Sequence, residues 1–173
     1  MSSDPTSAAD PTSAADARRR VTELIRQARI CMLTTIGVDG RMVSRPMALQ
    51  EAEFDGDLWF FASADSPKVR QIRVNPEVNV AFSDQRHDAW VSVSGTAQEG
   101  YDRAKAEQLW NPLLKTWFPD GLDTPGLTLI KVHANSAEYW DSPGGAVVNL
   151  LGFARAAVTG RPPKAGENHE VSY

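Results

Sequence analysis

Two segments of the chain carry residues that could bind an anion together. Ser66-Pro67-Lys68 follows an apolar and aromatic run and has the composition of a helix start, because Ser is a favoured N-cap and Pro suits the first helical position. The free N–H groups of a helix N-terminus attract anions, and Lys68 adds a positive charge there. Arg45 lies among apolar neighbours in the predicted strand 41–50. Its planar fork suits phosphate oxygens, so the two segments predict a phosphate clamp.

The same residues allow a simpler interpretation. Many helices begin with Ser-Pro, and Lys68, Arg70 and Arg73 could form a solvated basic face. The helix segment taken alone favours this interpretation. Arg45 shifts the balance, because an arginine in the middle of a strand prefers a partner.

The elements that must position the clamp are mostly strands. Period-2 alternation and turn residues predict strands at 30–36, 41–50, 57–63, 77–84, 89–100 and, as one or two strands, 127–141. Gly37 and Gly40 bound the hairpin turn between the first two strands. Pro46 indicates that the second strand is a sheet edge or carries a bulge, since proline cannot donate to a ladder.

Helices are predicted at fewer positions. One helix begins at Asp16, taken as an N-cap, and a second begins at Ser66. A third occupies 102–110, with a possible continuation broken at Pro112, and a fourth occupies 144–158. Six or so closely spaced strands with few helices between them are typical of a mainly β (α+β) fold, an antiparallel barrel with peripheral helices.

The N-terminus carries a tandem repeat, DPTSAA followed by DPTSAA. Two copies of six small or polar residues cannot bury a core. We therefore expect a disordered leader over 1–15, a single domain over 16–158 and a polar C-terminal tail over 159–173.

Composition excludes several function classes. The 173 residues carry a net charge of −4 with acidic and basic residues mixed, which argues against nucleic acid as a partner. No run of eighteen apolar residues and no signal peptide is present, so we expect no membrane association. A single cysteine, Cys31, allows no intrachain disulfide and favours the cytoplasm. The three histidines are far apart in the sequence, which argues against a metal site.

Several segments, taken in order, resemble the pyridoxamine 5′-phosphate oxidase-like FMN-binding split barrels, in particular the bacterial general stress proteins. The matching segments are SRPMAL, LWFFASADSPKVRQI, NPEVNVAF, WVSVSGTA, LWNPLLKTWFPDG, AEYWDSPGG and TGRPPKAGENHEV. Each segment is modest alone, but the ordered set is specific and covers nearly the whole chain from residue 18.

The resemblance implies a bound FMN whose phosphate is contacted by Arg45, Ser66 and Lys68. The backbone of five further residues would follow the isoalloxazine and ribityl groups: Met47, Ala48, Phe61, Ala62 and Ser63. Trp140 would cover the flavin, although a core aromatic near a strand end is an equal interpretation. FAD or a deazaflavin remains an alternative ligand. Haem is disfavoured because none of the histidines is placed as an axial ligand.

The family commonly forms homodimers with the flavin at the subunit boundary, so a homodimer is expected. We assign Trp110 and Trp117 to packing contacts, which could lie across a dimer interface. The expected activity is flavin-dependent oxidoreduction, with a nicotinamide as a possible electron donor and no catalytic side chain assigned. The alternative is a non-catalytic protein that binds or buffers flavin.

Three departures from the family argue against true pyridoxamine phosphate oxidase activity. Gln50 occupies the position where that enzyme has a lysine that holds the substrate phosphate. Pro67 replaces a basic residue before the clamp lysine, and the closing Arg-Leu-x-Pro segment is missing.

Overall fold

The structure is a computed structural model, and it describes residues 11–28, 30–50, 54–86, 88–141 and 167–172. The elements in chain order are α1 (Pro11–Gln27), β1 (Ile30–Ile36), β2 (Met42–Ala48), β3 (Asp57–Ser63), α2 (Pro67–Val74), β4 (Glu77–Asp84), β5 (Ala89–Gly100), α3 (Arg103–Leu109), the short 3₁₀ segments η1 (Pro112–Thr116) and η2 (Gly121–Asp123), β6 (Leu127–Asp141) and β7 (Glu167–Ser172). Among the described helices, none is long and apolar enough to cross a membrane.

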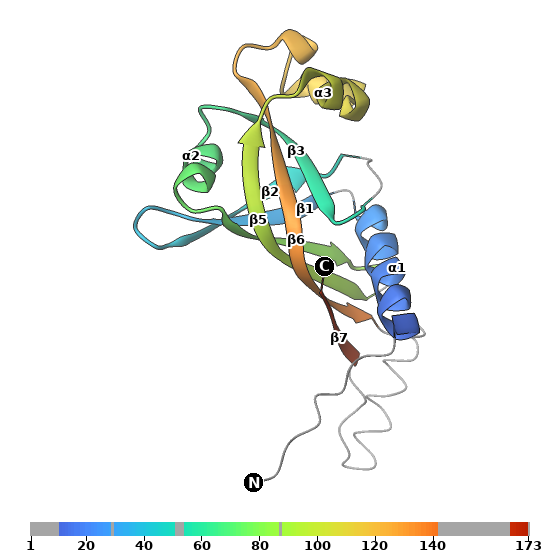
Figure 1. Cartoon of the computed structure of the whole chain (residues 1–173). Coiled ribbons are helices and arrows are strands. Elements are labelled where there is room, and N and C mark those ends of the chain that lie inside the picture. The colour runs from blue at the N-terminus through green and yellow to red at the C-terminus, as the bar shows by residue number, and fades with distance from the viewer. Residues whose placement is uncertain (1–10, 29, 51–53, 87, 142–166, 173) are drawn as a thin grey trace, which may run out of the picture.

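The strands form one antiparallel sheet in the order β2-β1-β4-β5-β6-β3, which confirms the predicted α+β antiparallel fold. The long β6 pairs with β3 along its first half and with β7 along its second half. Figure 1 shows α3 at one end of β5 and β6, α1 towards the other end, and α2 beside the β1–β2 hairpin. As Pro46 predicted, β2 is an edge strand.

The core lies on one face of the sheet because side chains alternate along each strand. In β1, Cys31, Leu33 and Thr35 are buried, whereas Ile30 and Met32 are exposed. The same alternation holds in β4 and β5, and α1 adds Val21, Leu24 and Ile25 to this core. On the opposite face of β2, β1, β4 and β5, several side chains of the described residues are exposed, among them Ile30, Met32 and Trp90.

A second, smaller cluster covers the outer face of β3. Phe61 packs edge-on against Trp110, with ring centroids 5.5 Å apart, and lies 6.3 Å from Phe118. This cluster explains why β3 reads as a nearly continuous apolar run, since both of its faces are covered. Trp110 therefore packs within the chain, whereas Trp117 is 65% exposed.

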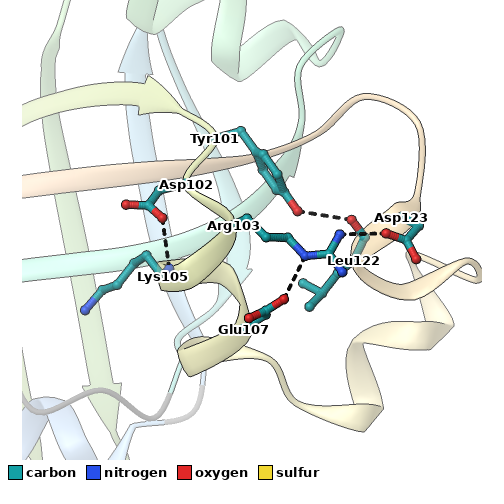
Figure 2. Close-up of polar contacts among 7 residues, drawn as sticks. All are labelled: Tyr101, Asp102, Arg103, Lys105, Glu107, Leu122 and Asp123. Carbon is teal, nitrogen blue, oxygen red and sulfur yellow. Dashed lines mark hydrogen bonds and ion pairs between the residues drawn. The ribbon is translucent and has the colours of Figure 1, made fainter.

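Polar contacts fix the lobe of α3, η1 and η2 that carries this cluster (Figure 2). Arg103 donates from Nε to Glu107 at 2.8 Å and from Nη1 to Asp123 at 2.6 Å, joining α3 to η2. Hydrogen bonds to these carboxylates raise the pKa of Arg103. The Tyr101 hydroxyl donates to the Leu122 carbonyl at 3.1 Å, which ties the end of β5 to the same segment.

Three expectations need correction or fall outside the described residues. The first helix begins at Pro11, not Asp16, because proline suits the first helical turn and the alanines that follow favour a helix. Residues 167–172, expected as polar tail, form β7, where Val171 is buried opposite Ala137. The helix predicted at 144–158 lies outside the described residues.

Candidate functional site

The candidate site lies where β3 runs into α2. Ser63 ends β3, and its carbonyl accepts a hydrogen bond from the Ser66 amide at 3.0 Å. Ser66 occupies the N-cap position in extended conformation and Pro67 begins the helix, as predicted. The Ser66 hydroxyl, however, makes no capping bond, and its Oγ is buried without a hydrogen-bond partner in the described structure. Buried hydroxyls are nearly always paired, so this oxygen lies ready for a partner from outside the chain.

Arg45 reaches α2 from the inner face of β2. Its Nη1 donates to Thr35 Oγ1 at 2.7 Å and its Nη2 donates to Gln71 Oε1 at 3.0 Å. Thr35, which is fully buried in β1, donates in turn to the same Gln71 oxygen at 2.6 Å. A longer contact of 3.4 Å joins Nη1 to the Leu33 carbonyl. The guanidinium is therefore held by neutral groups from a strand and a helix.

The electrostatics of the site favour an anion. Burial lowers the pKa of Arg45. Burial also lowers the pKa of Lys68, and the positive charge of Arg45 lowers it further. Among the described residues, no carboxylate forms an ion pair with either side chain. Two partly buried cations of like sign beside an unpaired hydroxyl fit the oxygens of a phosphate monoester.

The structure brings only some of the predicted site residues together. Arg45 and Lys68 lie close together, and Ser66 is the N-cap of the helix that carries Lys68. The three residues Phe61, Ala62 and Ser63 lead directly into the loop before α2. Met47 and Ala48 follow Arg45 on β2; the Met47 side chain is buried and the Ala48 side chain is exposed. The convergence comes through α2, because β3 pairs with β6 and not with β2.

Trp140 lies elsewhere in the chain. It pairs with Trp90 near the end of β6, whereas Ser63 pairs with Leu127 at the beginning of that strand. Trp140 and Trp90 share the outer face of the sheet, since paired residues of an antiparallel ladder point to the same side. Within one chain the structure does not place Trp140 beside the clamp.

Sequence reasoning missed Thr35 and Gln71. Each left a signal: Thr35 is the polar member of the inward-facing set of β1, and Gln71 stands three residues after Lys68, on the same helix face. Neither signal shows that both side chains meet Arg45, because that contact depends on how α2 packs against β1.

Other reactive side chains are occupied or buried. Burial raises the pKa of the Cys31 thiol to about 12, so it is not a nucleophile near neutral pH. His133 Nδ1 lies 2.9 Å from Oδ1 of Asp57, the first residue of β3, at the opposite end of that strand from Ser63. Within the described ranges, no cluster of three His, Cys, Asp or Glu side chains could hold a metal ion.

The sequence model of the family described as pyridoxamine 5′-phosphate oxidase like matches residues 16–164. The chain belongs to this family. The match covers the elements of the clamp, from β1 to α2, and continues through β6.

Relatives within the pyridoxamine 5′-phosphate oxidase-like family include proteins from bacteria and a fungus. The general stress FMN/FAD binding protein of Xanthomonas citri is 31% identical, with a TM-score of 0.66, covering 76% of this chain and 92% of that one. A Jannaschia sp. CCS1 protein assigned to general stress protein 26 is 25% identical, with a TM-score of 0.74, covering 92% of this chain and 99% of that one. Protein bli-3 of Neurospora crassa is 31% identical over 82% of this chain and 72% of its own length. The fold is the split barrel of the family, and its structural relatives are general stress proteins.

Proposed function

We propose that this protein is a flavin-binding general stress protein that holds FMN with its phosphate between Arg45, Ser66 and Lys68. The observation that carries the proposal is the Ser66 hydroxyl, which is buried without a described partner two residues before Lys68, and Lys68 in turn lies close to Arg45. A phosphate would accept from the hydroxyl and both cations, and so would remove the unsatisfied group and the charge repulsion together.

The relatives support a flavin as the carrier of that phosphate. The Xanthomonas citri protein is named for FMN or FAD binding, and it shares 31% identity with this chain. The segments 57–63 and 66–74 that form the site lie within the family match. We propose FMN as the ligand, because a terminal phosphate monoester uses all three groups of the clamp.

We extend the proposal to flavin-dependent oxidoreduction with a reduced nicotinamide as donor. A bound flavin supplies the electron or hydride transfer, and the protein supplies binding and orientation. In the described clamp, the chain's own contribution is to hold the phosphate with Arg45, Ser66 and Lys68. The alternative, flavin storage, differs in that no common donor would reduce the bound flavin.

The structure supports the view that the substrate is not a vitamin B6 phosphate. Gln50, at the position of the oxidase's substrate-binding lysine, is only 5% exposed. Its Nε2 donates at 3.1 Å to the carbonyl of Ala48, the last residue of β2. A neutral side chain folded back on the backbone offers no charge to a second phosphate.

We also propose that the protein is a homodimer in the cytoplasm. The open outer face of the sheet exposes large apolar side chains, among them Ile30 at 63%, Met32 at 41%, Met42 at 77% and Trp90 at 44%. Apolar patches of this kind mark interaction sites. Cys31, the single cysteine, is a free thiol, as expected in a reducing compartment.

The decisive experiment is the visible absorbance of the purified protein, with the released ligand identified by mass. One FMN per chain is the expected result, and steady-state reduction by NADH or NADPH then separates an oxidoreductase from a storage protein. A colourless protein that also fails to bind added FMN would overturn the proposal.

A further inference from the structure

Gln71 connects the two halves of the clamp. It lies in the middle of α2, and its Oε1 accepts from Arg45 Nη2 at 3.0 Å and from Thr35 Oγ1 at 2.6 Å. Arg45 Nη1 closes the triangle by donating to Thr35 at 2.7 Å. Ser66 and Lys68 belong to the same helix, so a single amide oxygen joins the groups on the helix to the arginine on the strand.

This triangle opposes a repulsion. The charge of Arg45 lowers the pKa of Lys68, so the two cations are close enough to repel each other. Without these hydrogen bonds, the repulsion would turn the arginine side chain away from Lys68, because arginine has many rotamers of similar energy to choose from. Two neutral acceptors on different elements hold Nη1 and Nη2 in place and thereby leave the guanidinium charge uncancelled.

We propose that Gln71 is a positioning residue that orients the Arg45 guanidinium beside Lys68 before an anion binds. The proposal rests on the assignment of the clamp to a flavin phosphate. An amide suits the role better than a carboxylate, because Glu would hold the guanidinium equally well but would cancel the charge that the phosphate needs.

The first test is a double-mutant cycle on FMN affinity. Gln71→Met keeps the length and helix propensity of the side chain and removes the acceptor. We expect it to raise the Kd for FMN about tenfold. In an Arg45→Ala background the same change should alter the Kd less than twofold, because there is no guanidinium left to orient. Gln108→Met, on the exposed face of α3, serves as the control.

A purely structural role would give a different pattern. If Gln71 only fixed α2, Gln71→Met would weaken FMN binding equally in both backgrounds, and this result would overturn the proposal. Riboflavin, which lacks the phosphate, provides a second contrast: its affinity should change less than twofold in Gln71→Met. Gln71→Glu should weaken FMN binding while the orientation of Arg45 is kept.

The orientation itself can be measured without any ligand. In the flavin-free protein, ¹⁵N NMR of arginine side chains should show separate, slowly exchanging Nη1 and Nη2 signals for Arg45. Gln71→Met should merge them, because the guanidinium would then rotate, whereas Gln71→Glu should keep them apart. Unchanged Arg45 signals in Gln71→Met would overturn the inference even if FMN binds as proposed. Failure of the wild-type protein to bind FMN would instead remove the proposed function and leave this measurement to decide the role of Gln71.

Discussion

Arg45 on β2 and Lys68 on α2 lie close enough that the charge of the arginine lowers the pKa of the lysine, and no described carboxylate pairs with either. Like charges held together without a counterion weaken the folded chain. The arrangement is useful only if an anion binds between them. Removing the charge of Lys68 should therefore change two measurable quantities in opposite directions: it should lower the affinity for the ligand and raise the stability of the free protein.

Removing either cation should weaken flavin binding while the barrel stays folded. A charge-assisted hydrogen bond contributes about 1.5–3 kcal/mol, so Arg45→Ala and Lys68→Ala should each raise the Kd for FMN by about tenfold to a hundredfold or more. Fluorescence titration measures this. Arg41→Ala, an exposed arginine near the β1–β2 turn, should leave the affinity unchanged. Full FMN affinity in both clamp variants would mean that the phosphate binds elsewhere.

Lys68→Met should stabilise the flavin-free protein at neutral pH by roughly 0.5 kcal/mol, the scale of a repulsive pair near the surface. Because folding lowers the pKa of Lys68 below its ordinary 10.5, the unfavourable charge is present at lower pH. It is lost as the pH rises through the folded-state value towards 10.5. The difference in free energy of unfolding between the two proteins should therefore shrink as the pH rises towards and past 10.5. Urea titrations over that range provide the measurement, with Lys115→Met as the control.

Ser66→Ala should separate binding from stability. The hydroxyl makes no capping bond and has no partner among the described residues, so its loss should leave the free protein as stable as before, or more stable by about 1 kcal/mol. The same change should weaken FMN binding by about tenfold and leave riboflavin binding unaltered. Thermal melts with and without each ligand measure both effects. A clear drop in the melting temperature of the free protein would show that the hydroxyl has a role within the fold.

Gly95, at the register shift in β5, should not tolerate replacement by a residue with a side chain. A Cβ on Gly95 would clash with the His133 carbonyl oxygen of β6, and the neighbouring backbone cannot move aside cheaply. Gly95→Ala should lower the free energy of unfolding by about 2–3 kcal/mol or more. Gly100→Ala, on the same strand with open space around it, should change it by no more than about 0.5 kcal/mol. Equal effects in urea denaturation would contradict the close approach of the two strands.

A charged residue on the outer face of the sheet should prevent dimer formation. Trp90 is 44% exposed on this apolar face, near the beginning of β5 and paired with Trp140. Light scattering should give twice 18.9 kDa for the wild-type chain and 18.9 kDa for Trp90→Glu, since a buried unpaired charge is costly. Val38→Glu, in the exposed β1–β2 turn, should remain dimeric. A wild-type monomer would contradict the proposed homodimer.

Local chemistry explains which features were predictable. Strict alternation defined β1, β4 and β5 correctly, and Ser-Pro located the start of α2, because each signal is contained in a few neighbouring residues. Pro46 correctly indicated an edge strand. The pairing of β3 with β6 was not foreseen, because no local pattern encodes which distant strand completes a sheet.

The candidate site divides in the same way. Residue type and helix position were enough to single out Ser66 and Lys68, and the structure places Arg45 close enough to Lys68 to lower its pKa. Their role as a phosphate site stays a prediction. Thr35 and Gln71 were missed because each is unremarkable in its own element and gains meaning only from the packing of α2 on β1. The strand in the C-terminal tail was missed because its polar composition hides a single buried residue, Val171.

The pairing of β3 with β6 also sets the order in which the chain can assemble. Asp57 meets His133 across 76 residues of sequence, whereas β1–β2 and β4–β5 are neighbours that pair early. During synthesis, β3 emerges with its aromatic residues Trp59, Phe60 and Phe61 and has no described strand partner until β6 has left the ribosome. The newly made chain therefore exposes this aromatic segment until β6 is complete, and we expect incomplete chains to be most prone to aggregation in that interval.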